Sequence, residues 1–190
     1  MIKFFTRNYS KSKLNVGDFN IIHDRAKKVI SKVTNTGFHV QGLQIEGPII
    51  VLNQQVILWD VPQYGVGGPK DDVEPLDKDV VCTDPSSPFY GWKTEMFNIF
   101  EKVEPKPELL LLGSGGAISS VPQPIKEYVN KLGIQIDVLN SRHASSTFNV
   151  LVEEGRNSAL ALLPYIPTSA RTGKVLVEVQ KKKPKDESEE

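Results

Sequence analysis

The sequence predicts an α/β fold in which an N-terminal β-meander precedes a β-α-β-α-β unit. Two observations lead to this class. Short apolar runs separated by turn residues fill residues 38–59, as the strands of a meander do. Apolar strands then alternate with helical patterns between residues 108 and 163, which is typical of sheets with parallel members. The length of 190 residues suits one such domain, which we place at residues 37–166.

The meander is predicted from three apolar runs, at residues 38–45, 48–52 and 56–59. Residues 53–55 form a plausible three-residue hairpin connection between the last two runs. Residues 62–92 follow as an acidic loop rich in proline. A connection of that length without periodicity is either functional or an insertion.

The second half has a regular order of elements. The predicted elements are a helix over 94–103 capped by Thr94, a strand over 108–112, a turn over 113–116, a helix over 122–132, a strand over 134–139, a helix over 141–154 and a strand over 158–163. Glycines at 133 and 155 end the two longer helices, as C-terminal caps do.

The charge balance is uneven along the chain. It holds 23 basic and 23 acidic side chains, but residues 1–32 carry eight basic and only two acidic ones. Residues 1–17 contain no acid and are rich in hydroxyls, which predicts a mitochondrial transit peptide. The pattern from Arg7 to Ser10 places cleavage after Tyr9, and the alternative is a disordered basic tail. Residues 18–36 are a leader whose first part, up to residue 32, is either a short basic helix or poorly ordered.

Composition argues against several classes of function. Cys82 is the only cysteine, so neither a disulfide framework nor a multi-cysteine zinc site is expected. The three histidines lack the spacing of metal ligands, and we expect neither metal nor cofactor. No apolar run is long enough for a transmembrane helix. The neutral charge disfavours nucleic acid as a partner.

One candidate pocket lies at the turn after the strand over 108–112. The turn differs from the dinucleotide fingerprint because Ile118 stands where the third glycine is needed. Arg142 begins the next helix, so with the turn it would line a polar pocket at the carboxyl ends of the strands. The alternative is that Arg142 pairs with a nearby carboxylate or carbonyl group. The candidate ligand-pocket residues are Gly113, Ser114, Gly115, Arg142, Asn149 and Arg156.

The other candidates are structural or belong to an interface. Asn149 is a poor helix former in mid-helix, which predicts a buried hydrogen bond from its amide. The hydroxyls at 145–147 beside His143 lack a nucleophile elbow, so no catalytic residue is predicted. Aromatic residues anchor interfaces, and the interface candidates are Phe89, Tyr90 and Trp92, with core packing as the alternative for Trp92.

Three segments carry a family resemblance. They are Gly-Leu-x-Ile-x-Gly-Pro-Ile at 42–49, Glu-Leu-Leu-Leu-Leu-Gly-Ser-Gly at 108–115 and Thr-Phe-Asn-Val-Leu-x-x-Glu-Gly-Arg at 147–156. Over residues 38–164 the chain resembles the mitochondrial complex I assembly factor 3 family and its prokaryotic relatives. It departs from the family at Ser114, where threonine is common, and in a longer, more acidic 62–92 segment.

The resemblance implies three layers around a mixed central sheet and a non-enzymatic role in assembling the peripheral arm of complex I. The implied partners are another assembly factor and peripheral-arm subunits, in the matrix or peripherally on the inner membrane. A homodimer is also compatible. The alternative is a small-molecule or anion-binding protein or enzyme that uses the turn and Arg142. If the source organism lacks complex I, the domain would have another role in mitochondria. Residues 167–190 are expected to be an extension and a disordered charged tail.

Overall fold

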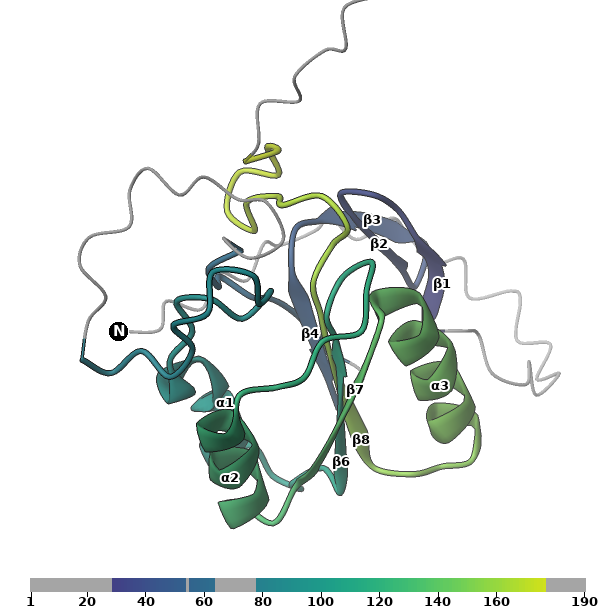
Figure 1. Ribbon diagram of the computed structural model, residues 1–190. Coiled ribbons are helices and arrows are strands. Elements are labelled where there is room, and N and C mark those ends of the chain that lie inside the picture. The colour runs from purple at the N-terminus through teal and green to yellow at the C-terminus, as the bar shows by residue number, and fades with distance from the viewer. Residues whose placement is uncertain (1–28, 54, 64–77, 177–190) are drawn as a thin grey trace, which may run out of the picture.

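A computed structural model describes residues 29–53, 55–63 and 78–176 (Figure 1). The predicted transit peptide, its cleavage site after Tyr9, most of the leader, the middle of the acidic loop and the charged tail lie outside the described residues. The elements are β1 (Ile30–Val33), β2 (Gly37–Val40), β3 (Leu43–Glu46), β4 (Ile49–Leu52), β5 (Gln55–Leu58), the 3-10 helix η2 (Thr94–Phe97), α1 (Ile99–Lys102), β6 (Leu109–Gly113), α2 (Gln123–Lys131), β7 (Gln135–Leu139), α3 (Ser141–Glu153) and β8 (Ser158–Leu162).

A mixed five-stranded sheet forms the centre, in the order β5-β4-β8-β6-β7. β6 lies parallel to both β7 and β8, whereas β4 is antiparallel to β5 and β8. The strands β4, β6 and β8 are almost continuously apolar because helices or strands cover both of their faces. The α/β class with a mixed central sheet is therefore confirmed.

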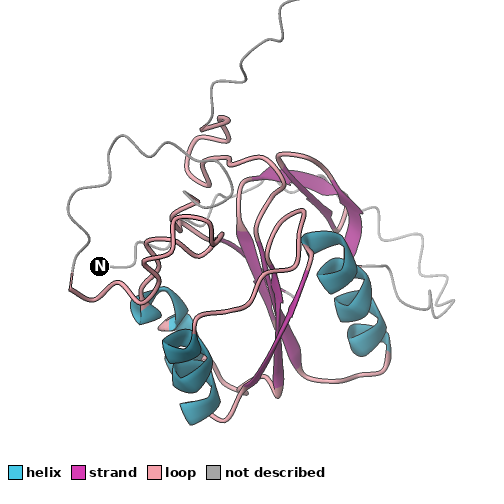
Figure 2. Ribbon diagram, in the orientation of Figure 1, coloured by secondary structure: helices cyan, strands magenta, loops and turns pink. Residues whose placement is uncertain are grey.

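Two hydrophobic cores lie on opposite faces of this sheet. Leu110 and Leu112 of β6 belong to the core that contains residues of α1, α2 and η2. Leu111 points the other way, into a core shared with α3, β1 and β2. Figures 1 and 2 show the helices on either side of the sheet, with β1, β2 and β3 next to α3. The fold thus has three layers.

The N-terminal part of the meander differs from the prediction. Residues 30–33 form β1 of a separate antiparallel sheet, β1-β2-β3, and are neither helical nor a leader. The predicted single strand over 38–45 is two strands, because Gln41 and Gly42 have φ angles of 50° and 84°. Two consecutive positive φ angles are the signature of a two-residue hairpin turn.

The segment over 94–103 is also less regular than predicted. It consists of η2 and a single turn, α1, rather than one helix. Lys93 occupies the N-cap position with an extended backbone, and no side chain caps η2, so the predicted cap at Thr94 is wrong. None of the helices in the described ranges has the length and apolar character needed to cross a bilayer.

The two longer helices follow the predicted pattern. Gly133 and Gly155 follow α2 and α3 with φ angles of 83° and 74°, which favour glycine. The cap of α3 was not predicted: the side chain of Asn140 accepts a hydrogen bond of 2.8 Å from the backbone N–H of His143.

Candidate functional site

The turn at the carboxyl end of β6 is held by hydrogen bonds within the chain. The Ser114 hydroxyl donates to the carbonyl of Ala117 at 2.6 Å. The backbone N–H of Gly115 donates at 2.9 Å to the hydroxyl of Ser141, and that hydroxyl donates to the carbonyl of Leu163. Ser114 and Ser141 are buried, so their polar groups serve the fold.

Gly113 is required by the close approach of β6 to α3. A Cβ at this position would lie 2.6 Å from Leu162 Cδ2 and 2.8 Å from the Cα of Ser141. The glycine therefore permits the packing of the strand end against the start of the helix. Gly115 serves the turn itself, with a φ angle of 90°.

Arg142 is exposed on the first turn of α3. Its carbonyl accepts a hydrogen bond from the Ser146 hydroxyl at 3.1 Å. Over the described part of the chain its guanidinium has no ion pair with a carboxylate. Because the neighbouring turn already uses its polar atoms, the structure does not bring Arg142 and the turn together as a set of convergent ligand-binding groups.

Asn149 makes the buried hydrogen bond that the sequence predicts, and a second one beside it. Its Oδ1 accepts from the backbone N–H of Ile30 at 3.0 Å, and its Nδ2 donates to the carbonyl of the same residue at 2.8 Å. The side-chain amide thus pairs with β1 as a neighbouring strand would. Asn149 therefore attaches β1 to α3.

Arg156 lies beyond the other end of α3, away from Arg142. A helix of 13 residues is about 20 Å long, so the two arginines do not share one pocket. Arg156 Nη2 lies 3.8 Å from Glu108 Oε2, and both side chains are about half exposed or more. Such a pair contributes little to stability. The six pocket candidates therefore do not form one site: Gly113, Ser114 and Gly115 lie in the turn, whereas Arg142, Asn149 and Arg156 lie at the start, in the middle and beyond the end of α3.

A hollow of about 320 Å³ lies beside Arg156, at the amino end of β8. Val29, Phe148 and Val152 form its apolar wall, and Asn53, Asn157 and Ser158 add polar groups. Ser158 is 7% exposed, and its hydroxyl has no hydrogen-bond partner within the described residues. A buried hydroxyl without a partner is unfavourable, and the Ser158 oxygen itself is closed off from solvent, so the hollow offers it no hydrogen-bond partner.

Two of the three interface candidates are core residues, which corrects the prediction. Phe89 and Trp92 are both 0% exposed. Trp92 packs edge-on against Trp59, with ring centroids 5.1 Å apart, and its Nε1–H donates to the carbonyl of Pro62 at 2.8 Å. The indole N–H thus finds a partner inside the core, as buried tryptophans require. Tyr90 is half-buried.

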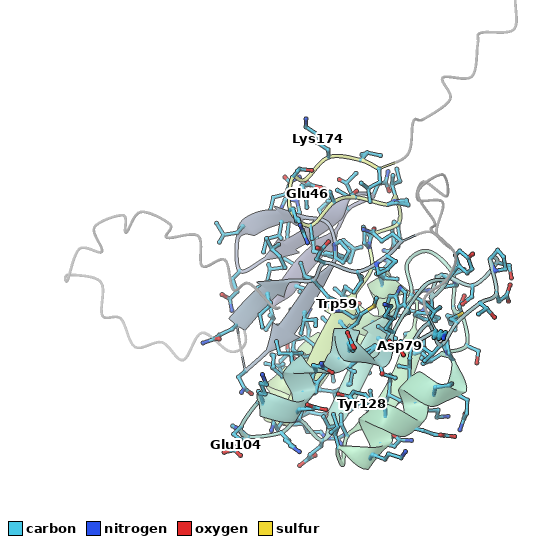
Figure 3. All side chains as sticks on the ribbon, turned by 90° about the vertical axis from the view of Figure 1, so that its left-hand side faces the viewer. Glu46, Trp59, Asp79, Glu104, Tyr128 and Lys174 are labelled. Atoms are coloured by element: carbon cyan, nitrogen blue, oxygen red, sulfur yellow. The ribbon has the colours of Figure 1, made fainter. Side chains whose placement is uncertain are left out.

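A second buried side-chain amide, that of Gln63, lies in a stretch of sequence without periodicity that would predict it. Gln63 is buried and makes two hydrogen bonds to the backbone of Thr168, of 2.8 Å from its Nε2 and 3.1 Å to its Oε1. Arg171 pairs with Asp60 nearby. Residues 167–176 therefore pack against the domain: a Cβ at Gly173 would lie 3.4 Å from the Cβ of Glu46, and Figure 3 shows Lys174 of this segment at the same end of the molecule as Glu46. A Cβ at Gly47 would lie 2.8 Å from the backbone of Ala170, so this close approach requires the glycine that precedes Pro48.

Two titrating groups among the described residues have a shifted pKa. Hydrogen bonds from the backbone N–H and the hydroxyl of Ser86 lower the pKa of Asp84, and the pKa of Tyr128 is raised. Tyr128 of α2 is labelled in Figure 3. Its hydroxyl donates to Glu101 Oε1 at 2.6 Å and lies 2.9 Å from Asn98 Oδ1. Burial, together with the hydrogen bond to Glu101 and its negative charge, raises the pKa of Tyr128 to about 12. The contact joins α2 to α1. Among the described residues no group of three or more His, Cys, Asp and Glu side chains is arranged to hold a metal ion.

Named relatives match most of this chain. It is 25% identical over 135 residues to the NADH dehydrogenase (ubiquinone) 1 alpha subcomplex assembly factor 3 of Xenopus tropicalis, which covers 71% of this chain and 60% of that protein. The chain thus matches less than two thirds of the length of this relative. The Drosophila melanogaster protein of the same name is 26% identical over 193 residues, which covers 96% of this chain and 84% of that protein.

Solved structures support the fold. A crystal structure of a protein from Bordetella parapertussis has a TM-score of 0.52 at 18% identity and covers 72% of this chain and 94% of that one. This likeness shows the arrangement of elements alone. The family model described as "Protein of unknown function (DUF498/DUF598)" matches residues 30–163, from β1 to the residue after β8, and the chain therefore belongs to this family.

Proposed function

We propose that this chain is a non-enzymatic assembly factor for mitochondrial respiratory complex I. The observation that carries the proposal is the similarity to proteins named as complex I assembly factor 3, which extends over 96% of the chain in the Drosophila melanogaster relative. The relatives from Xenopus tropicalis and Bos taurus carry the same name. The mechanism is protein docking, in which the domain holds an incomplete peripheral-arm module until its partners arrive.

The proposed partners are a second assembly factor and peripheral-arm subunits, and the proposed location is the mitochondrial matrix, either free or peripherally on the inner membrane. The basic segment 1–17, cleaved after Tyr9, would supply the import signal. The alternative, anion binding at the turn over 113–116 with Arg142, has less support because the hydroxyls and amides of that turn already bond within the chain.

The test is affinity purification of the tagged full chain from mitochondria, combined with removal of the chain from the same cells. The expected result is recovery of peripheral-arm subunits together with a second assembly factor. Removal should lower the amount of mature complex I and leave a peripheral-arm subcomplex visible on native gels. Recovery of no complex I component, with complex I at its normal level after removal, would refute the proposal.

A matched pair of variants tests whether the recovery of complex I components depends on the folded domain. Leu111→Asp places a charge in a fully packed position between β6 and α3, so it should unfold the domain and abolish both recovery and rescue. Val150→Asp makes a similar change on the exposed face of α3, where the side chain is 51% exposed, and should preserve the fold.

A further inference from the structure

The central sheet ends at β7, and this edge is open in the described part of the molecule. β7 is the last strand in the order β5-β4-β8-β6-β7 and has β6 as its neighbour. Figure 1 shows β7 crossing in front of the other strands, with α2 on one side and α3 on the other. An open sheet edge presents backbone groups that can pair with another chain.

The hydrogen bonds to β6 identify which backbone groups face this edge. The N–H of Gln135 donates to the carbonyl of Glu108, and the carbonyl of Leu139 accepts from Ser114, both at 2.9 Å. The direction of backbone groups alternates along a strand, so residues 135, 137 and 139 bond to β6. The N–H and C=O groups of Ile136 and Val138 therefore point to the open edge. No other described segment bonds to them.

The side chains of β7 differ between its two faces. Asp137 pairs in register with Leu111, which belongs to the core under α3, and Asp137 is exposed beside that core. Ile136 pairs with Leu110 and, with Val138, packs into the other core, under α2. A strand added to this edge would therefore place apolar side chains next to Ile136 and Val138, and a side chain on its other face next to Asp137.

The carboxylate of Asp137 selects among partners for this edge. Two copies of this chain could pair their β7 strands antiparallel about a twofold axis. In the register with the greatest overlap, Asp137 of one copy lies directly opposite Asp137 of the other. Like charges directly opposite each other destabilise a strand pair, which disfavours a second copy of this chain. A basic side chain in the same place gains from the opposite charge.

We propose that the open edge of β7 binds an extended segment of a partner protein in which apolar and basic residues alternate. The segment adds a sixth strand to the sheet, bonds to the backbone of Ile136 and Val138, and pairs a lysine or arginine with Asp137. The inference rests on the proposed function, because a docking protein needs such a surface, and it specifies the chemistry of the partner.

The first test uses the full chain and two synthetic peptides of ten residues, one alternating valine with lysine and one alternating valine with glutamate. Amide hydrogen exchange is measured by NMR. With the valine–lysine peptide, exchange at Ile136 and Val138 should slow at least tenfold, whereas the valine–glutamate peptide should leave it unchanged. Asp137→Lys should reverse this preference.

Glu153→Lys is the matched control, since it makes the same change of charge on an exposed residue of α3. It should keep the preference of the unaltered chain. Thermal melts of both variants establish that each is folded. The inference is overturned if the valine–lysine peptide protects neither amide, or if Asp137→Lys and Glu153→Lys respond alike, which would indicate general electrostatic attraction.

The same variants separate this inference from the proposed function in mitochondria. If the unaltered chain recovers peripheral-arm subunits and Asp137→Lys loses them while Glu153→Lys retains them, the edge is the docking surface. If all three recover the subunits, the edge inference is wrong and the proposed function stands. If the unaltered chain recovers none, the proposed function itself fails, and the peptide experiment still decides the chemistry of the edge.

Discussion

At the scale of single residues, two side-chain amides attach segments at the two ends of the described domain, β1 at the start of the family-matched region and residues 167–176 beyond its end. Asn149 pairs with the backbone of Ile30 and Gln63 with that of Thr168, each through one donated and one accepted bond. An amide side chain offers a donor and an acceptor at a spacing that suits the backbone of a single residue. These two residues therefore replace strand neighbours that the sheets do not supply.

Asn149→Ala should destabilise the fold by about 2 kcal/mol or more, because it leaves a buried N–H and a buried C=O of Ile30 without partners. Urea unfolding measures the loss. Hydrogen exchange should also accelerate at Gln41, whose N–H bonds to Val29 in the continuation of β1. The control Val150→Ala, on the exposed face of the same helix, should change the stability by less than about 0.5 kcal/mol.

Ser158→Ala should stabilise the protein, by about 1 kcal/mol, because it removes a buried hydroxyl that has no partner within the described residues. Ser141→Ala is the opposite case, because the Ser141 hydroxyl bonds to both Gly115 and Leu163. This substitution should lower the stability of the protein by about 1–3 kcal/mol. Thermal unfolding compares the two. A loss of stability in Ser158→Ala would show that solvent or a bound molecule satisfies the hydroxyl.

At the scale of elements, a pair of glycines isolates the packing of residues 167–176. Gly42 and Gly47 have nearly the same φ angles, 84° and 85°, so alanine is strained equally at both. A Cβ at Gly42 meets nothing within 4 Å, whereas one at Gly47 would lie 2.8 Å from the backbone of Ala170.

Gly42→Ala should therefore cost about 1–2 kcal/mol through strain alone. Gly47→Ala should cost more, because the segment around Ala170 must move away as well. Proteolysis should then cut residues 167–176 faster in Gly47→Ala than in Gly42→Ala. Equal rates in the two variants would mean that this segment does not depend on the approach to Gly47.

The contact between α1 and α2 should make stability depend on pH in the alkaline range. The pKa of Tyr128 rises from 10.0 to about 12 on folding, so the folded state holds the phenolic proton more tightly than the unfolded state. The resulting stabilisation is complete below pH 10 and is lost as the pH rises towards 12. Denaturant unfolding measured between pH 10 and pH 12 should show a fall in the free energy of unfolding. Tyr128→Phe should make this fall smaller, and Tyr165→Phe should leave it as it is.

The elements of the second half could be predicted because their signals are local. The apolar runs of β6 and β8 and the glycines after α2 and α3 mark their own boundaries. β1 could not be predicted, since its four residues become a strand only through pairing with β2 and the amide of Asn149. Thr94 is the first residue of η2 rather than its cap, and the tertiary contact of this element, in which Phe97 packs edge-on against Trp59, is not visible in the local sequence.

The candidate site was harder to predict than the fold. The turn over 113–116 and Arg142 are close in the order of elements, but whether their polar groups converge depends on three-dimensional contacts such as that of Ser141 with Leu163. Trp92 and Phe89 lie in a stretch without periodicity, so no pattern distinguishes a buried aromatic there from an exposed one. The open edge of β7 follows only from the strand order.

At the scale of the whole molecule, the central sheet is shared by two cores. Trp59 and Trp92 report on the core under α1 and α2, whereas Phe148 lies in the core under α3. β6 and β8 contribute to both, so loss of either core exposes the same strands. The two halves should unfold together.

Thermal unfolding followed by tryptophan fluorescence and by far-ultraviolet circular dichroism should therefore give coincident transitions. Phe148→Leu, which reduces packing in the core without tryptophan, should lower both midpoints equally, by about 4 °C for each kcal/mol lost. A fluorescence transition that stays in place while the dichroism shifts would mean that the cores are independent.

The pairing of β4 with β8 has a consequence for the order in which the fold can be completed. Ile49 pairs with Leu162, at almost the opposite end of the family-matched region. A chain that leaves the ribosome amino end first presents β4 before β8 is made, so β4 has only β5 as a neighbour in its sheet, and a two-stranded hairpin is marginally stable in water. The apolar residues 49–52 therefore lack their second strand neighbour, β8, until nearly the whole domain has been synthesised. Such long-range pairing slows folding, and a holding chaperone would be most useful during this interval.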